Sequence, residues 1–276
     1  MPSGIANNYY SRTKMNSKNR GSALLVALVF ATFSTSTLAA LATGSQNISG
    51  TRTTPAYGDA NLKDNAGNAG PFGPYSWDYS YTRSFDGKKL EKDIQIDFSF
   101  DAALNYTAAQ KDAYIKAAKA GVSSVWDNKY AVKDNSTGQV IPIFVAVTTD
   151  GPFNQKVQVH AGPGRSDMLN WYTGDSASVN AHEVGHMMGL FDEYIGGAVD
   201  KYPNPTLSND GLMGLGALNA NPVMYPRYYQ QYYDYMKQLN PDTPFTLVAV
   251  PEPSEVMLLC GGLFFLMGMY GRKRQA

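Results

Sequence analysis

The stretch Ala181-His-Glu-Val-Gly-His-Met-Met-Gly-Leu-Phe-Asp-Glu-Tyr194 guides the interpretation of the whole sequence. His182 and His186 lie four positions apart in it, so on an α-helix both side chains leave the same face and can bind one metal ion. Glu183 directly follows the first histidine. The chain contains only 3 histidines, and two of them fall at this spacing around a glutamate. The stretch therefore predicts a metal-binding helix.

The residues around the two histidines follow the pattern of an amphipathic helix. Apolar side chains recur at helical spacing on the opposite face, at Ala177, Ala181, Val184 and Met188. Asp175 or Ser176 can cap the start of the helix. Gly189 permits the left-handed conformation that turns a chain out of a helix, and this turn would bring Asp192 back as a third ligand.

Two imidazoles and one carboxylate are a typical ligand set for catalytic zinc, with a fourth position left for water. Zinc lowers the pKa of such a water to about 7. Glu183 would take the proton as the water attacks a peptide carbonyl, and would then pass it to the leaving amine. The same ligands can hold ferrous iron, but an iron site does not need a glutamate beside its first histidine. Zinc is therefore the predicted metal.

The third ligand has alternatives. Glu193 could be the third ligand in place of Asp192, because a shift of one residue in the loop would exchange them. If Asp192 is the ligand, we expect Glu193 to hydrogen-bond one of the metal-binding side chains without touching the metal. A glutamate on a later helix is nearly excluded, because none occurs between Glu193 and Glu252. His160 ends a predicted strand and is interpreted as structural, with a metal role as the alternative.

Calcium is a further open alternative. Asp192, Glu193, Asp200 and Asp210 lie near loop glycines, but their spacing matches no defined calcium loop.

The composition excludes some classes of binding partner and of metal site. Lys plus Arg and Asp plus Glu number 23 each, so no overall charge attracts nucleic acid. The single cysteine, Cys260, excludes internal disulfides and a thiolate-rich metal site.

The N-terminal region predicts export. Residues 1–20 are basic, the apolar run 22–33 follows, and small residues lead to Ala42, so residues 1–42 are predicted to be a secretory signal peptide. Residues 43–90 are rich in Gly, Asn, Ser and Thr and are predicted to be a loosely structured leader or a propeptide.

Residues 91–246 predict one mixed α/β (α+β) catalytic domain. Ile94, Ile96, Phe98 and Phe100 alternate as in a strand, and Thr107 to Val125 has helical spacing. Further strands are expected at 139–149, 156–160 and 168–172, and a C-terminal helix at 227–239. We expect a mixed twisted sheet with a long backing helix, and the polar segment 156–160 is predicted to be the sheet edge that pairs with an extended peptide substrate.

The pattern His-Glu-x-x-His-x-x-Gly-x-x-Asp at 182–192 resembles the zinc site of the metzincin metallopeptidases. Aspartate as third ligand is similar to the small secreted snapalysin type of bacteria. The resemblance extends over 181–226 by motif and over 91–246 by the order of elements. It implies that His182, His186 and Asp192 bind zinc and that Glu183 is the catalytic base.

The metzincin resemblance also implies a methionine in a tight turn beneath the metal. Met213, between glycines, is favoured, and Met224 is the competing residue. Tyr225 does not match the tyrosine that some metzincins place near zinc, because it follows Met224 directly.

The C-terminal segment 247–276 contains Pro251, Glu252 and Pro253, then the apolar run Val256 to Tyr270 and a basic end. This order is typical of a short membrane anchor. It resembles the PEP-CTERM sorting signal of Gram-negative bacteria, which implies contact with the secretion machinery, processing by an exosortase, and a place in the cell envelope or extracellular matrix.

Two functions remain open from the sequence. The first is a secreted zinc endopeptidase that acts on proteins or peptides. The alternative is a weakly active or inactive, zinc-stabilised binding module attached to the envelope. Glu183 favours the enzyme, because a structural zinc site does not need it.

Overall fold

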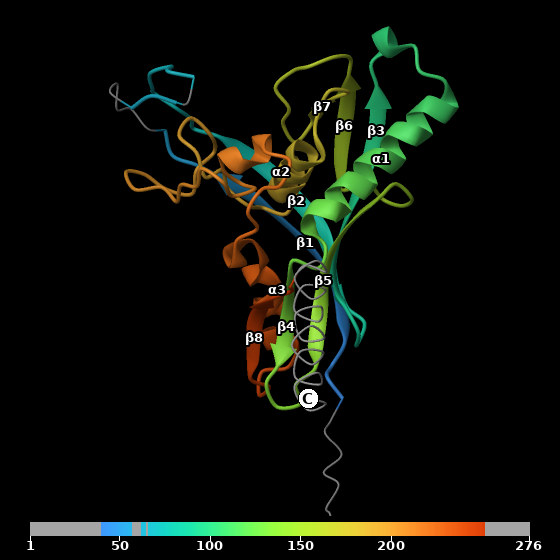
Figure 1. Cartoon of the computed structure of the whole chain (residues 1–276), viewed down its shortest axis with the longest axis vertical. Helices are drawn as coiled ribbons and strands as arrows, with labels where there is room; N and C mark the ends of the chain where they lie inside the picture. Colours follow the sequence, from blue (N-terminus) through green and yellow to red (C-terminus); the bar gives the residue numbers. More distant parts are fainter. Residues whose placement is uncertain (1–39, 57–61, 65, 252–276) are drawn as a thin grey trace, which may run out of the picture. The chain divides into compact units, whose positions relative to one another are not determined.

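A mixed β-sheet runs through the part of the chain that the computed structural model describes, residues 40–56, 62–64 and 66–251 (Figure 1). Its main path is β1 (Gly44–Thr53), β2 (Ser76–Phe85), β3 (Leu90–Phe100), β5 (Val140–Thr148), β4 (Tyr130–Asp134) and β8 (Phe245–Ala249); β6 (Gln155–His160) and β7 (Asn170–Tyr172) branch from β3. The predicted mixed α/β class is confirmed at this level.

β3 is the strand on which the other strands converge. Alternate residues on one face of it, Leu90, Ile94 and Ile96, are fully buried. Of the predicted alternating set, Ile94 and Ile96 are thus in the core, whereas Phe98 and Phe100 are partly buried. One edge of β3 pairs in parallel with β5, and the other pairs with two strands in succession. β2 pairs antiparallel with its first half, and β6 pairs in parallel with its second half.

Asn154 lies at the point where β6 replaces β2 along β3. Its main-chain N–H donates to the carbonyl of Gln95 over 2.7 Å, and its side-chain oxygen accepts from the N–H of Gln95 over 3.0 Å. Because these bonds satisfy the main chain of β3 at the junction, β2 can leave the plane of the sheet beyond it.

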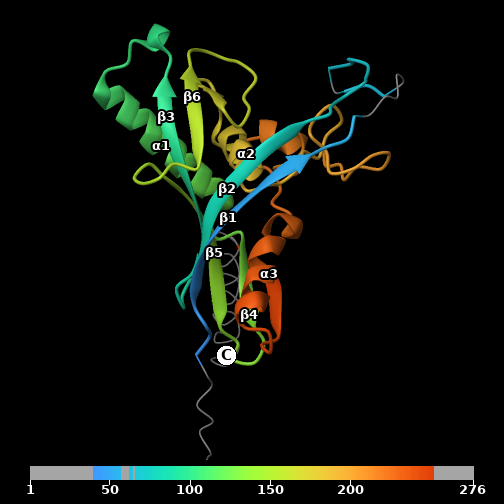
Figure 2. The same cartoon turned by 180° about the vertical axis from the view of Figure 1, so that it is seen from behind.

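Two helices cover one face of the sheet, as the opposite views in Figures 1 and 2 show. α1 (Ala108–Trp126) matches the predicted backing helix and begins with a capping box between Thr107 and Gln110. It packs against β5 and against α2 (Ala177–Met187). Short 3-10 turns occur at Ala102–Leu104 and Leu215–Leu218.

The predicted C-terminal helix is present as a 3-10 turn at Pro226–Tyr229 followed by α3 (Gln230–Leu239). Its tyrosines serve packing: Tyr229 is buried and donates to the carbonyl of Trp126, and Tyr232 is buried and donates to the carbonyl of Phe144. α3 is thereby fixed to both α1 and the sheet.

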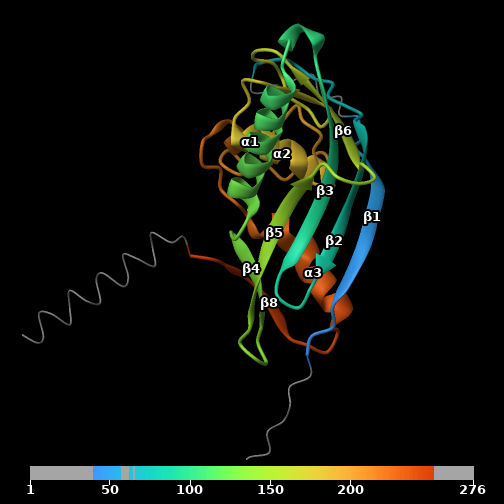
Figure 3. The same ribbon diagram turned by 90° about the vertical axis from the view of Figure 1, so that its right-hand side faces the viewer.

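The segment 43–90 differs from the expected loosely structured leader. β1 and β2 pair antiparallel along ten residues each and continue the sheet beyond β3 (Figure 3). The sequence prediction missed this hairpin because the Gly, Asn and Ser residues between and around the strands dominate the composition. The strands β4 and β8 were also not predicted, and β8 extends from the predicted domain into residues 247–249, which were expected to be linker.

The predicted sheet edge at 156–160 is wrong for residues 158–160, which pair with β7. Within β6, Gln158 and Val159 are paired with β3 on one side and with β7 on the other. The sequence reasoning failed because a polar strand is not necessarily an exposed edge, and the short strand β7 was not expected to pair there.

The predicted signal peptide falls outside the described residues up to position 39, and the predicted sorting signal does so from Glu252 onward. Between residues 40 and 251, gaps excepted, no helix combines the length and apolar character that a membrane crossing requires.

Candidate metal centre

α2 begins and ends as its sequence predicted. Ser176 caps it by accepting a hydrogen bond from the N–H of Val179 over 3.3 Å. After the helix, Gly189 has a φ of 82°, which glycine adopts at little cost. This turn directs the chain back toward Asp192.

α2 is buried on several faces, not only along its predicted apolar stripe. Of the predicted apolar stripe, Ala181 and Val184 are fully buried, whereas Ala177, in the first turn, is exposed. From α1, the indole N–H of Trp126 donates to the carbonyl of Ala181 over 3.0 Å. Packing from several sides therefore fixes the position of the helix.

The two histidines are oriented by main-chain carbonyls. Nδ1 of His182 lies 2.8 Å from the carbonyl oxygen of Leu212, and Nδ1 of His186 lies 2.9 Å from that of Leu190. A carbonyl only accepts, so each Nδ1 carries a proton, and in the neutral imidazole Nε2 then has the lone pair that binds a metal. The two Nε2 atoms lie 3.1 Å apart. Such outer partners are typical of metal-binding histidines.

Asp192 brings a carboxylate to the same point. Its Oδ1 lies 3.1 Å from Nε2 of His182 and 3.2 Å from Nε2 of His186. Its Oδ2 accepts a hydrogen bond from the N–H of Ala198 over 2.6 Å. A Cβ at Gly197 would lie only 2.5 Å from that Oδ2, so glycine is required for this close approach.

The geometry of these three side chains fits a cation. Oδ1 of Asp192 is buried and finds no hydrogen-bond partner within the described part of the chain. Ligand atoms of His182, His186 and Asp192 all lie within 4.8 Å of one another, and no other such group is found among the described residues. Three converging donor atoms, one of them a buried carboxylate oxygen, need a positive charge among them, which a proton or a metal ion can supply. The group could therefore bind a metal ion.

The electrostatics of the cluster also favour positive charge. Burial alone would lower the pKa of His186, but the Asp192 carboxylate raises it to about 9. Burial raises the pKa of Glu183, which the neighbouring histidines only partly offset. A carboxylate with a raised pKa is a stronger base. Glu183 thus has the character that a proton acceptor beside a metal requires.

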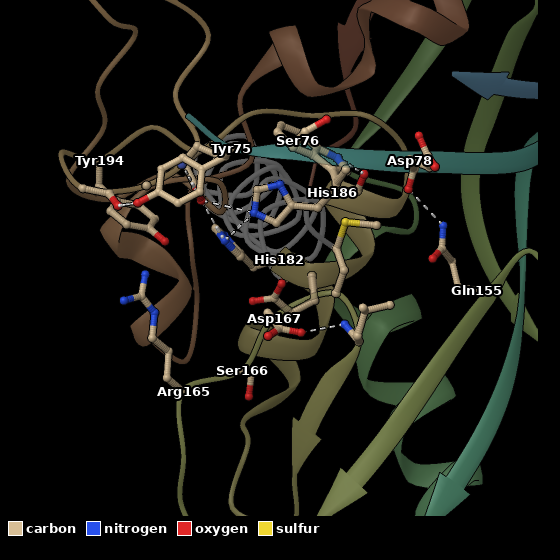
Figure 4. Close-up of a pocket in the computed structure, with 18 residues that line it drawn as sticks. Tyr75, Ser76, Asp78, Gln155, Arg165, Ser166, Asp167, His182, His186 and Tyr194 are labelled. Atoms are coloured by element: carbon tan, nitrogen blue, oxygen red, sulfur yellow. Dashed lines mark hydrogen bonds and ion pairs between the residues drawn. The ribbon is translucent and has the colours of Figure 1, made fainter. Parts of the chain in front are cut away.

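A cavity of about 610 Å³ opens over the cluster and is lined by His182, Glu183, His186 and Asp192 (Figure 4). The segment 75–78 at the start of β2 forms one wall, and the loop 165–169 forms another. A second cavity of about 320 Å³ shares His182 and Glu183 and extends along the apolar segment 215–218. The candidate metal centre is thus open to a ligand of peptide size.

Tyr194 lines both cavities and was given no role by the sequence analysis. Its ring centre lies 6.3 Å from that of His182. Burial, followed by the charge of Asp192, raises the pKa of its phenol, although a hydrogen bond with Arg165 opposes this. The phenol therefore keeps its proton and can donate a hydrogen bond. Its position two residues after Asp192 was the signal that could have identified it.

Glu193 lies beside the metal cluster without joining it. Its carboxylate accepts hydrogen bonds from Arg227 over 2.5 and 2.6 Å and from the hydroxyl of Tyr228 over 2.8 Å. Its main-chain N–H donates to the carbonyl of Met213 over 2.7 Å. The expected hydrogen bond to a metal ligand is absent from these contacts; Glu193 instead holds the Asp192 loop against the turn that contains Met213.

Met213 is the methionine that packs against α2. It is fully buried in a turn closed by a 2.9 Å hydrogen bond from the N–H of Gly214 to the carbonyl of Gly211. A Cβ at Gly185, between the two histidines, would lie 2.4 Å from its sulfur. The competing Met224 is only partly buried and precedes the 3-10 turn at 226–229.

The β1–β2 hairpin supplies contacts that the sequence analysis did not foresee. The indole N–H of Trp77 donates to the carbonyl of His186 over 3.1 Å, and the two rings meet edge to face with centres 5.6 Å apart. Arg52 donates to the carbonyl of Gly189 over 2.9 Å. The end of α2 is thus held by a segment more than a hundred residues earlier in the chain.

The other candidate ligands have protein partners. His160 lies 3.1 Å from Asp101 and 3.0 Å from Asn170, which fits its structural interpretation. Asp200 accepts from Thr206, and Asp210 accepts from Ser208 and Tyr225. Neither aspartate is part of the His182–His186–Asp192 cluster.

No protein-family model, curated protein or solved structure matches this chain.

Proposed function

We propose that this protein is a zinc endopeptidase with a metzincin-like catalytic domain. The observation that carries the proposal is the convergence of His182, His186 and Asp192 beside Glu183, on the floor of a cavity open to a peptide. Two nitrogen ligands and one oxygen ligand, each fixed from outside by the main chain, suit zinc.

Zinc bound by these residues would supply a Lewis acid that polarises a peptide carbonyl and acidifies water. Glu183 takes the proton from the attacking water and delivers it to the leaving amine, because it is buried beside the ligands and its pKa is raised. Tyr194 donates a hydrogen bond to the carbonyl oxygen as negative charge develops there. Asp192 offsets part of the charge of the metal.

The second candidate is a zinc-stabilised binding module with weak or no activity. The open cavity would serve a binding module equally well. A zinc site that only stabilises the fold, however, does not need a glutamate such as Glu183 beside its ligands. The two functions differ in one observable, which is chelator-sensitive peptide hydrolysis.

The test compares the full chain with Glu183→Gln on casein and gelatin, with and without 1,10-phenanthroline. We expect cleavage that the chelator abolishes and zinc restores, and at least about a 100-fold loss of kcat in Glu183→Gln with its metal retained. Glu91→Gln, which removes a carboxylate outside the cavity, is the matched control. A metal-loaded protein that cleaves neither substrate would support the binding module, and iron in the purified protein would contradict zinc.

We also propose that the chain is exported and processed at both ends, through residues 1–42 and 247–276. Mass spectrometry of the mature protein should find a new N-terminus near Thr43 and the loss of the basic C-terminus. Cleavage before Gly44 and after Ala249 would leave the sheet intact, because β1 begins at Gly44 and β8 ends at Ala249. A cell-associated protein with both original termini would count against the proposal.

A further inference from the structure

Part of β2 has an edge without a neighbouring strand. β1 covers one edge of β2 over its whole length, but β3 covers the other only from Thr82 to Phe85. Beyond that point β6 takes the place beside β3, and no strand of the described residues pairs with residues 76–81 of β2 on this side. Unpaired strand edges bind other extended chains.

The direction of the main-chain groups follows from two hydrogen bonds at the ends of β2. The N–H of Thr54 donates to the carbonyl of Tyr75, so the odd-numbered residues of β2 face β1. The N–H of Asp86 donates to the carbonyl of Lys89, so the even-numbered residues face the opposite edge. The N–H and C=O groups of Ser76 and Asp78 therefore point away from β1.

This free edge borders the candidate metal centre. Ser76, Trp77 and Asp78 line the same cavity as His182 and Glu183. Figure 4 shows Ser76 and Asp78 beside this cavity with His182. Trp77 lies between Ser76 and Asp78, and its indole N–H donates a hydrogen bond to the carbonyl of His186. This bond holds the free edge of β2 at a fixed distance from α2.

The edge already accepts one hydrogen bond from an amide. The side chain of Gln155, at the start of β6, donates to the carbonyl of Asp78 over 3.5 Å. The side chains of Ser76 and Asp78 are bonded to β1 instead: that of Asp78 accepts from Thr51, and that of Ser76 lies 3.3 Å from the hydroxyl of Thr53. The edge thus offers main-chain groups, which recognise an extended peptide irrespective of its sequence.

We propose that Ser76 and Asp78 bind an extended segment of the substrate by main-chain pairing, so that the peptide adds a strand to β2 as it crosses the cavity. This inference rests on the proposed peptidase function. It assigns substrate binding to the β1–β2 hairpin, in the place where the sequence had suggested β6.

Ser76→Pro tests the pairing, because proline removes the N–H that points into the cavity and leaves the hydrogen bonds to β1. Ser49→Pro is the matched control: Ser49 lies opposite Ser80 on β1, and its N–H points to the outer edge of the sheet. Circular dichroism and metal content check that both variants fold. Substrates are internally quenched peptides of four and ten residues with the same cleavage site.

We expect Ser76→Pro to lower kcat/KM for the ten-residue peptide about tenfold relative to the four-residue peptide, through one or two lost hydrogen bonds. Ser49→Pro should leave that ratio unchanged. A second test replaces single amides of the ten-residue peptide by esters. At one or two positions the ester should lower kcat/KM of the natural protein, and at those positions it should not lower kcat/KM of Ser76→Pro any further. An unchanged ratio in folded Ser76→Pro would overturn the inference.

Direct binding separates this inference from the proposed function. Fluorescence anisotropy measures the affinity of the labelled ten-residue peptide for Glu183→Gln and for Glu183→Gln with Ser76→Pro. Weaker binding in the second variant supports the pairing even if the natural protein cleaves nothing. Cleavage by the natural protein, with equal binding by the two variants, would refute the pairing and leave the peptidase proposal standing.

Discussion

Lys92 is a buried cation in the apolar row of β3. Its ammonium lies 2.7 Å from the side-chain oxygen of Gln231 and 4.5 and 4.7 Å from the ring centres of Tyr81 and Tyr232. Burial, and then the charge of Arg83, lowers its pKa to about 7. The unfolded chain, with the ordinary value of 10.5, binds this proton more tightly than the folded protein does.

The substitution Lys92→Met should therefore stabilise the protein at pH 7. Between about pH 7 and 10.5 the unfolded state holds more protons, so the natural protein gains stability as pH rises, and below that range its penalty is constant. We expect Lys92→Met to be more stable by about 2 to 4 kcal/mol at pH 7, with a smaller difference at pH 10. Urea unfolding at both pH values measures this. The exposed Lys88→Met is the control, and a difference independent of pH would contradict the prediction.

The assignment of the third ligand is tested with two alanine variants. Asp192→Ala removes the carboxylate that lies within 3.2 Å of both histidines, and should lower zinc affinity by at least about 100-fold. His160→Ala should keep the zinc, because His160 contacts Asp101 and Asn170 instead. Competition with a chromogenic chelator gives both affinities. Zinc kept by Asp192→Ala and lost by His160→Ala would reverse the assignment.

Sequence reasoning reached the cluster because its geometry is local. The spacing of His182 and His186 and the turn at Gly189 are properties of one helix and its end. Trp77 was missed, since its position in the cavity depends on how distant segments fold together. Tyr194 was missed although it lies only two residues after Asp192. Glu193 was placed beside the cluster, but its partner Arg227 lies 34 residues later and no pattern indicated the pair.

At the scale of the elements, α2 and the turn around Met213 form the closest packing at the site. Gly185→Ala would add a Cβ 2.4 Å from the sulfur of Met213, and should destabilise the protein by roughly 1 to 3 kcal/mol. Combination with Met213→Ala should cost less than the sum of the two single changes, because the new methyl group would fill space that the methionine leaves. Thermal unfolding of the three variants decides this, and strict additivity would show that the two residues do not share the space.

Elements with a strong local period were predicted within a few residues, as β3, β5, α1 and α3 show. The hairpin β1–β2 was not predicted, although Trp77, Tyr79, Tyr81 and Phe85 place aromatic residues at alternate positions of one strand. The polar residues between them and the glycine-rich surroundings concealed the pattern. β4 and β8 have only five residues each, too few for a clear period, and β8 is held in the sheet by its pairing with β4.

For the whole molecule, metal binding should contribute directly to stability, because the ligands come from both α2 and the loop after it. Removal of the metal by chelator should lower the melting temperature by roughly 10 °C if zinc is present far above its dissociation constant. Added zinc should restore the original value, and Glu183→Gln should show the same shift because it retains all three ligands. Melting temperatures that do not respond to chelator would argue against a metal at this site.

The order of strands could not be obtained from the sequence. Strand pairing in this sheet joins residues far apart in the chain, as in the contacts of β4 with β8 and of β3 with β5. An alternating apolar pattern predicts that a segment is a strand of a sheet, but it does not predict which strand lies beside it. The error about β6 has this origin.

The tryptophans give the candidate centre an optical reporter. The chain has 3 of them, and two donate to carbonyls of α2: Trp126 to Ala181 and Trp77 to His186. Because the Trp77 ring lies edge to face with that of His186, a colour-bearing ion such as Co²⁺ or Cu²⁺ bound at the cluster should quench its emission. Loading of the protein could thus be followed in real time without a label, and Trp77→Phe would remove most of the signal.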